Sequence, residues 1–161
     1  MTQCAACRGC PPWPSSFASP SWGDACGVFG IYGPGEDVAN ITYFGLYGLQ
    51  HRGQEGAGMA VWDGQELRRH RGLGLAAQVF NEQVLRELKG DVALGHVRYS
   101  TMGGNTVPNT QPMVGEGKFG PFALAHNGNL INAAALRADL EADGVVFAAT
   151  SDTEVIAKLV E

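Results

Sequence analysis

The stretch Cys-Gly-Val-Phe-Gly-Ile-Tyr at residues 26–32 marks the sharpest change of composition in the chain. β-Branched and aromatic residues alternate in it, as is typical of a strand, and Gly33-Pro34-Gly35 ends it. Residues 1–25 are rich in proline and serine and nearly free of aliphatic side chains, so we expect an unstructured leader there. With 161 residues in all, we expect one folded domain over residues 26–161.

Hydrophobic spacing and turn residues predict the elements that follow this first strand. A helix over residues 37–49 would bury Val38, Ile41, Gly45 and Leu49, and a loop would follow at 50–56. The remaining expected elements are strands at 57–62 and 66–71 around an Asp63-Gly64 hairpin, a helix at 78–88, a strand at 92–98, a loop to 118, a strand at 121–126, a helix through Ala133, Leu136 and Leu140, and a helix from Ser151. Hairpins with helices between them predict an α+β fold of mostly antiparallel sheet.

Charge and composition exclude several classes of partner. A net charge of −5 with scattered Lys and Arg offers no field for nucleic acid or an anionic membrane. No apolar run approaches the ~20 residues that span a bilayer, and no secretory signal begins the chain, so we expect a cytoplasmic protein. Glycine-rich nucleotide fingerprints are also missing from the sequence.

Four polar motifs lie where predicted strands end and loops begin, which is where a rigid sheet presents side chains to a substrate. They read Cys-Gly-Val-Phe-Gly at 26–30, Gln-His-Arg-Gly-Gln-Glu-Gly at 50–56, Gly-His-Val-Arg-Tyr-Ser-Thr at 95–101 and Ala-His-Asn-Gly-Asn-Leu at 125–130. In this order they resemble the class II glutamine amidotransferases, and the wording of 50–56 is most similar to the amidophosphoribosyltransferase family. The resemblance implies an N-terminal-nucleophile hydrolase fold, a sandwich of antiparallel sheets flanked by helices.

The resemblance assigns chemistry to particular residues. Cys26, exposed as an N-terminal residue by removal of 1–25, would attack the amide of L-glutamine, form a γ-glutamyl thioester and release ammonia. Its freed α-amino group, with an ordinary pKa of ~7.7–8.0, would act as the base. Asn127 through its side-chain amide and Gly128 through its N–H would form the oxyanion hole. Taken locally, Asn127-Gly128 also fits a simple turn.

Charged residues of the same motifs would hold the free amino acid. The resemblance places the substrate α-carboxylate on Arg98 and its α-ammonium group on Asp152, while Arg52 and Gly53 would shape the pocket. Read locally, Arg98 also fits a salt bridge at a strand end. Asp152 also fits a helix start, inside a capping box from Ser151 to Glu154.

Other cysteines and histidines leave alternatives open. A Cys–His pair of Cys26 with His96 or His126 would make an internal thiol hydrolase that needs no leader removal. Without that pairing, we expect these histidines to be structural or orienting. The leader cysteines Cys4, Cys7 and Cys10 have a spacing that suggests metal, but three thiolates without a fourth ligand favour incidental cysteines, and we expect no metal or cofactor in residues 26–161.

The resemblance also implies parts that this sequence lacks. Complete members finish the glutaminase sheet and add a phosphoribosyltransferase domain, so residues 26–161 are expected to be C-terminally incomplete. That absent domain would pass ammonia to 5-phosphoribosyl diphosphate, the first committed step of de novo purine synthesis, and would bring Mg²⁺, an iron–sulfur cluster in some members, and homo-oligomer contacts. The alternatives are an inactive fragment and the glutaminase domain of another class II amidotransferase.

Overall fold

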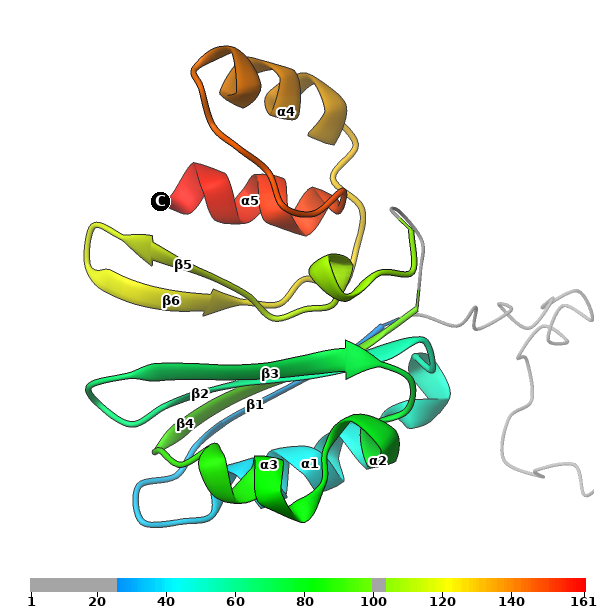
Figure 1. Ribbon diagram of the computed structural model, residues 1–161, viewed down its shortest axis with the longest axis vertical. Helices are drawn as coiled ribbons and strands as arrows, with labels where there is room; N and C mark the ends of the chain where they lie inside the picture. The colour runs from blue at the N-terminus through cyan, green and yellow to red at the C-terminus, as the bar shows by residue number, and fades with distance from the viewer. Residues whose placement is uncertain (1–25, 100–103) are drawn as a thin grey trace, which may run out of the picture.

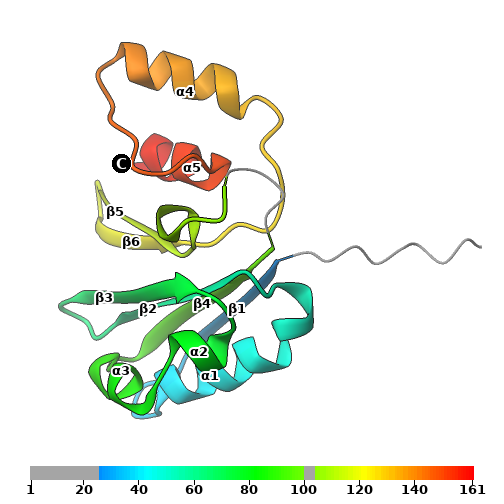
Figure 2. The same cartoon turned by 45° about the vertical axis from the view of Figure 1, so that its right-hand side comes forward.

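The computed structural model describes residues 26–99 and 104–161, so the predicted leader and its three cysteines lie outside the described residues. The described chain forms four layers: three helices, a four-stranded sheet, a two-stranded sheet, and a layer of two further helices (Figures 1 and 2). Antiparallel strands with interspersed helices confirm the predicted α+β class. Among the described residues, no helix combines the length and the apolar character that crossing a membrane requires.

The larger sheet has the strand order β1-β4-β2-β3, and each neighbouring pair is antiparallel. Its strands are β1 (Gly27–Tyr32), β2 (Gly56–Trp62), β3 (Leu67–Leu73) and β4 (Val92–Arg98). The predicted hairpin between β2 and β3 is confirmed: the Asp63 carboxylate accepts from the backbone N–H groups of Gln65 and Glu66, and Gly64 takes a φ of 95°.

Helices α1 (Val38–Gly48), α2 (Ala76–Val79) and α3 (Glu82–Glu87) cover one face of this sheet. Asp37 caps α1 by accepting from the Asn40 N–H at 3.1 Å. The predicted buried face of α1 was partly wrong, because Ile41 is 36% exposed while Thr42 and Leu46 are fully buried.

The single helix predicted at 78–88 was also wrong. The chain instead forms α2 and α3, because the Asn81 side chain accepts from the Val84 N–H at 2.9 Å and starts a new helix. Residues Phe80 and Asn81 lie between the two helices with extended backbone. The break lets Phe80 bury its ring in the core under the sheet, at 3% exposure.

The smaller sheet pairs β5 (Met113–Gly117) with β6 (Gly120–Leu124), and α5 (Asp152–Val160) packs on β5, with α4 (Ala133–Ala142) beyond it. A second apolar cluster of Met113, Ala149 and Ala157 joins this sheet to α5. The unbroken loop predicted up to residue 118 was wrong, since it contains β5 and the 3-10 turn η2 (Val107–Asn109).

Alternation along the central strands separates the apolar core from a polar layer. On β2 and β4, Met59 and Val97 point to the helices and are fully buried in the core. Their neighbours Gly58, His96 and Arg98 therefore face the smaller sheet. Residue 26, the end of β4, the end of β6 and the start of α5 all gather at one end of the sandwich, on the right in Figure 1.

Candidate active site

Cys26 lies immediately before β1, the edge strand of the larger sheet, and is 9% exposed. Its thiol Sγ donates to the backbone carbonyl of Tyr99 and accepts from the Tyr99 N–H, both at 3.3 Å. These bonds hold the sulfur against the residue that follows β4. Among the described residues, no imidazole forms a hydrogen bond with this sulfur.

Arg52 is the last residue of the 3-10 turn η1 (Gln50–Arg52), and Gly53 follows it; this loop lies beside Cys26. The Arg52 Nε donates to the Cys26 carbonyl at 3.3 Å. A Cβ on Gly53 would come within 2.7 Å of the Arg98 backbone, so only glycine lets this loop approach the end of β4. A cleft of about 240 Å³ is lined by residues 51–55 of this loop and by Tyr99.

Asn127 reaches the same cysteine from the other half of the fold. Its Nδ2 donates to the Cys26 carbonyl at 2.6 Å, across a sequence separation of 101 residues. Asn127 and Gly128 lie in the irregular connection between β6 and α4, with a bend at Gly128, and they do not join two strands of a hairpin. The contact brings Asn127, one of the two predicted oxyanion residues, to the side of Cys26.

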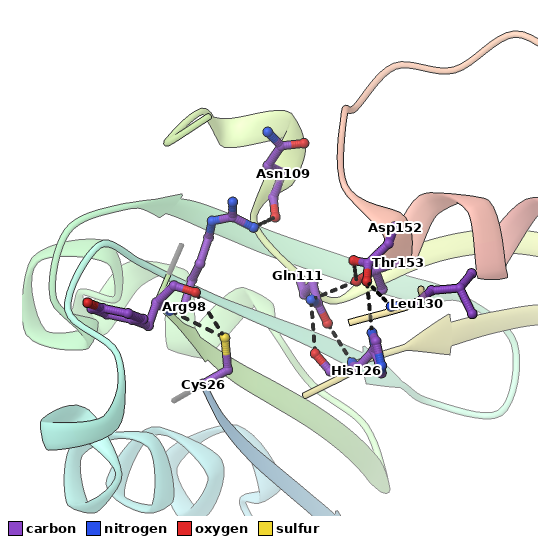
Figure 3. A network of polar contacts seen from close by, with 9 residues as sticks. Cys26, Arg98, Asn109, Gln111, His126, Leu130, Asp152 and Thr153 are labelled. Atoms are coloured by element: carbon purple, nitrogen blue, oxygen red, sulfur yellow. Dashed lines mark hydrogen bonds and ion pairs between the residues drawn. The ribbon is translucent and has the colours of Figure 1, made fainter. Parts of the chain in front are cut away.

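Arg98, the last residue of β4, is 3% exposed and points away from the helices into the polar layer. Its Nη1 donates to the Asn109 carbonyl at 2.7 Å, and its Nη2 to the Gly104 carbonyl at 3.4 Å. Figure 3 shows the guanidinium directed at the Asn109 backbone, with Cys26 close to the start of its side chain. These two carbonyls fix the plane of the guanidinium.

Asp152 lies in the first turn of α5 and is 6% exposed. Its Oδ2 accepts from the Leu130 N–H at 2.7 Å, which ties α5 to the segment that follows Asn127 (Figure 3). The His126 Nδ1 lies 4.0 Å from the same oxygen. Asp152 is therefore joined to the segment that carries Asn127 and Gly128.

The predicted capping box at the start of α5 was wrong. Ser151 is the N-cap residue but makes no side-chain cap, and its backbone N–H donates to the Asn109 Oδ1 at 3.1 Å. The Glu154 carboxylate accepts instead from the N–H groups of Ala148 and Ala149, at 2.9 and 2.6 Å. The Asn109 side chain, 42 residues away, therefore accepts from the Ser151 N–H, which the capping box would have paired with Glu154.

Asn109 and Gln111 are the site residues that sequence reasoning missed. Asn109 is 1% exposed; its carbonyl binds Arg98, and its side chain binds the backbone of Thr150 and Ser151. Gln111 is 4% exposed and binds the backbone of His126. Only the mixed polar composition of the 104–112 segment hinted at them, and that composition equally fits a plain loop.

His96 is fully buried in the layer between the sheets. Burial and, to a smaller extent, the positive charge of Arg98 lower the pKa of its imidazole to about 4, against a weaker opposing interaction with the His126 backbone. A neutral imidazole at this depth fits a structural role, as expected for His96. Its burial also disfavours a Cys26–His96 pair.

No group of three or more His, Cys, Asp or Glu side chains that could hold a metal occurs within residues 26–99 and 104–161. Cys4, Cys7 and Cys10 lie outside the described part of the chain.

Comparisons with known proteins agree on one relationship. Residues 69–161 match a family model described as a glutamine amidotransferase domain. The amidophosphoribosyltransferase of Synechococcus elongatus is 52% identical over 134 residues, covering 83% of this chain and 27% of the relative. That of Bacillus subtilis is 50% identical over 139 residues, covering 86% and 29%. The chain thus spans less than a third of the length of these relatives.

Solved structures give the same result. Glutamine phosphoribosylpyrophosphate amidotransferase from B. subtilis, in complex with ADP and GMP, superposes with a TM-score of 0.72 at 50% identity, over 81% of this chain and 28% of that one. A structure described as the allosteric regulatory enzyme of purine biosynthesis gives a TM-score of 0.75 at 51% identity, over 82% and 28%. The likeness extends through both sheets and confirms the predicted sandwich architecture.

Proposed function

The chain belongs to the family of glutamine amidotransferase domains, and on that premise we propose that it hydrolyses the side-chain amide of L-glutamine with Cys26 as nucleophile. The observation that carries the proposal is that two predicted site residues, from opposite sides of the fold, both bind Cys26. Arg52 from the larger sheet's side and Asn127 from the smaller sheet's side both donate to its carbonyl oxygen. A single cysteine is thereby set at the junction of the predicted pocket.

The chemical steps follow from these positions. The Cys26 Sγ attacks the amide carbon of glutamine, and the thiol proton passes through the α-amino group, freed by cleavage after Ala25, to the leaving nitrogen. The C–N bond breaks, ammonia leaves, and a γ-glutamyl thioester remains. Water then attacks the thioester and releases glutamate and the thiol. Asn127 and Gly128 stabilise the oxyanion in both steps, each donor contributing about 3 kcal/mol.

The two ends of the amino acid are held by opposite charges. Arg98 binds the α-carboxylate through its planar guanidinium, and Asp152 binds the α-ammonium group. Support comes from their low exposure, 3% and 6%, because a charge shielded from water interacts more strongly with a substrate. Asn109 accepts a hydrogen bond from Arg98 through its carbonyl and one from the Ser151 N–H, next to Asp152, through its side chain. These bonds keep the two charges at a fixed separation.

The names of the relatives suggest the fate of the ammonia. We propose that it is transferred to 5-phosphoribosyl diphosphate by a phosphoribosyltransferase part, within a homo-oligomeric cytoplasmic enzyme. The cytoplasm keeps thiols reduced, as a catalytic cysteine requires.

The proposal is tested by preparing the full chain and a form that begins at Cys26, each with a Cys26→Ala counterpart. Glutamate release from L-glutamine is measured together with the intact mass of the active species. We expect release only from protein whose mass begins at Cys26, and none after Cys26→Ala. Release by protein that retains residues 1–25 would favour the internal thiol mechanism, and no release by folded protein that begins at Cys26 would overturn the proposal.

A further inference from the structure

Gln111 lies between η2 and β5, in a segment to which the mechanism above assigns no part. We propose that Gln111 is a positioning residue of the active site, whose side-chain amide fixes the segment of Asn127 and Gly128 against the start of α5. The inference rests on the proposed function, since it concerns the placement of the oxyanion donors. It adds a residue that touches no substrate atom and acts through its neighbours.

All polar atoms of the Gln111 side chain are engaged at once. Its Oε1 accepts from the His126 N–H at 2.6 Å, while its Nε2 donates to the His126 carbonyl at 3.1 Å and to the Thr153 Oγ1 at 2.9 Å. Figure 3 shows the amide between the His126 backbone and the start of α5. Because an amide has distinct donor and acceptor ends, this pattern permits only one orientation of the group.

The segment that Gln111 holds has no regular structure of its own. Residues 125–130 lie between β6 and α4, outside any helix or strand, so no ladder of hydrogen bonds fixes their backbone. Gln111 binds both the N–H and the carbonyl of His126, as a neighbouring strand would do. This fixes the residue immediately before Asn127, and a displacement of about 1 Å at a reacting group costs about 100-fold in rate.

Gln111 itself is anchored to the larger sheet. A Cβ on Gly58 of β2 would stand 2.1 Å from the Gln111 carbonyl oxygen, so the bare glycine lets this backbone lie directly on the sheet. The Arg71 Nη1 of β3 donates to the Thr110 carbonyl next to it, at 2.8 Å. Through Gln111, the rigid four-stranded sheet sets the position of a loop that belongs to the smaller one.

A Gln111→Met variant tests the inference, because methionine keeps the length and removes the amide. Gln83→Met is the matched control, since Gln83 is exposed on α3 and bonds only to Glu87 in the described structure. We expect kcat for glutamate release to fall about 10- to 100-fold with a change in KM below about threefold. Arg98 keeps its bonds to the Asn109 and Gly104 carbonyls, and the start of α5 keeps its backbone bonds to the Asn109 side chain, so substrate binding persists.

Amide hydrogen exchange at Leu130 supplies a readout that needs no catalysis. The Leu130 N–H donates to Asp152, so its exchange reports whether the 125–130 segment stays in register with α5. We expect at least about tenfold faster exchange in Gln111→Met and unchanged exchange in Gln83→Met. If Gln111→Met does not fold, Thr153→Val removes one bond of the three, and Thr153→Ser should restore kcat.

The outcomes separate the two proposals. Unchanged Leu130 exchange, or faster exchange with unchanged kcat, overturns the positioning role. A rise in KM of about 10- to 100-fold with unaltered kcat also overturns it, since that result assigns Gln111 to substrate binding. If the wild-type protein releases no glutamate while Leu130 exchange accelerates in Gln111→Met, the proposed function fails and the positioning role is supported.

Discussion

Replacing His96 with leucine should make the folded state less sensitive to acid, because the buried imidazole resists protonation. In the folded protein its pKa is about 4, whereas an unfolded chain holds histidine near 6.5. Between these values the unfolded state binds a proton that the folded state does not. The free energy of unfolding of the wild type therefore falls as pH decreases from about 7 to about 4, and this contribution is constant above about 7.

The magnitude follows from the separation of the two pKa values. Each pH unit between 6.5 and about 4 is worth about 1.4 kcal/mol, so His96 removes about 3 kcal/mol of stability over that interval. In His96→Leu this contribution disappears, whatever the stability of the variant at pH 7. The wild type should therefore lose about 3 kcal/mol more than His96→Leu between pH 7 and pH 4.

Urea denaturation at half-unit intervals of pH, followed by circular dichroism, measures both curves. Carboxylates that titrate in the same range are common to the two proteins, so their contribution cancels in the difference. His51→Leu serves as a control, because His51 is an exposed residue of η1. Parallel curves for wild type and His96→Leu, within about 0.5 kcal/mol, would refute the assignment of His96 as a neutral buried imidazole.

Three further results are expected. Asn127→Ala should lower kcat for glutamate release about 100- to 1000-fold without preventing cooperative unfolding, and an unaffected kcat would remove this residue from the oxyanion hole. Asp152→Asn retains an acceptor for the Leu130 N–H but loses its charge, so KM for glutamine should rise at least about tenfold while kcat changes little. Gly53→Ala should destabilise the protein by about 1–3 kcal/mol in thermal unfolding, since its Cβ meets the end of β4. Gly48→Ala, where nothing lies within 4 Å, should be neutral or slightly stabilising.

Sequence patterns predicted those elements whose signals are local. β1 and the β2–β3 hairpin follow from alternation and from Asp63-Gly64, and both occur where expected. β5 escaped prediction because Met113–Gly117 contains two glycines and becomes a strand only by pairing with β6. The split between α2 and α3 depends on a single asparagine cap inside an otherwise helical pattern.

The site divides in the same way. Motif order placed Cys26, Arg52 and Asn127 in one pocket, and the structure brings these three together. Asn109 and Gln111 could not be predicted, because most of their partners lie between 11 and 42 residues away and the segment around them reads as a loop. A polar side chain that binds the backbone of a distant segment adds nothing to the hydrophobic periodicity from which helices and strands are predicted.

The 2.6 Å bond between Asn127 and Cys26 has a consequence for how the protein folds. It closes a loop of 101 residues, and such long-range contacts form after local ones because the chain must first lose the entropy of closure. A nascent chain that has folded only its first sheet thus presents a cysteine without its oxyanion donors. Glutamine cleavage should then appear with the slowest phase of folding, which makes ammonia release a signal that both sheets have docked.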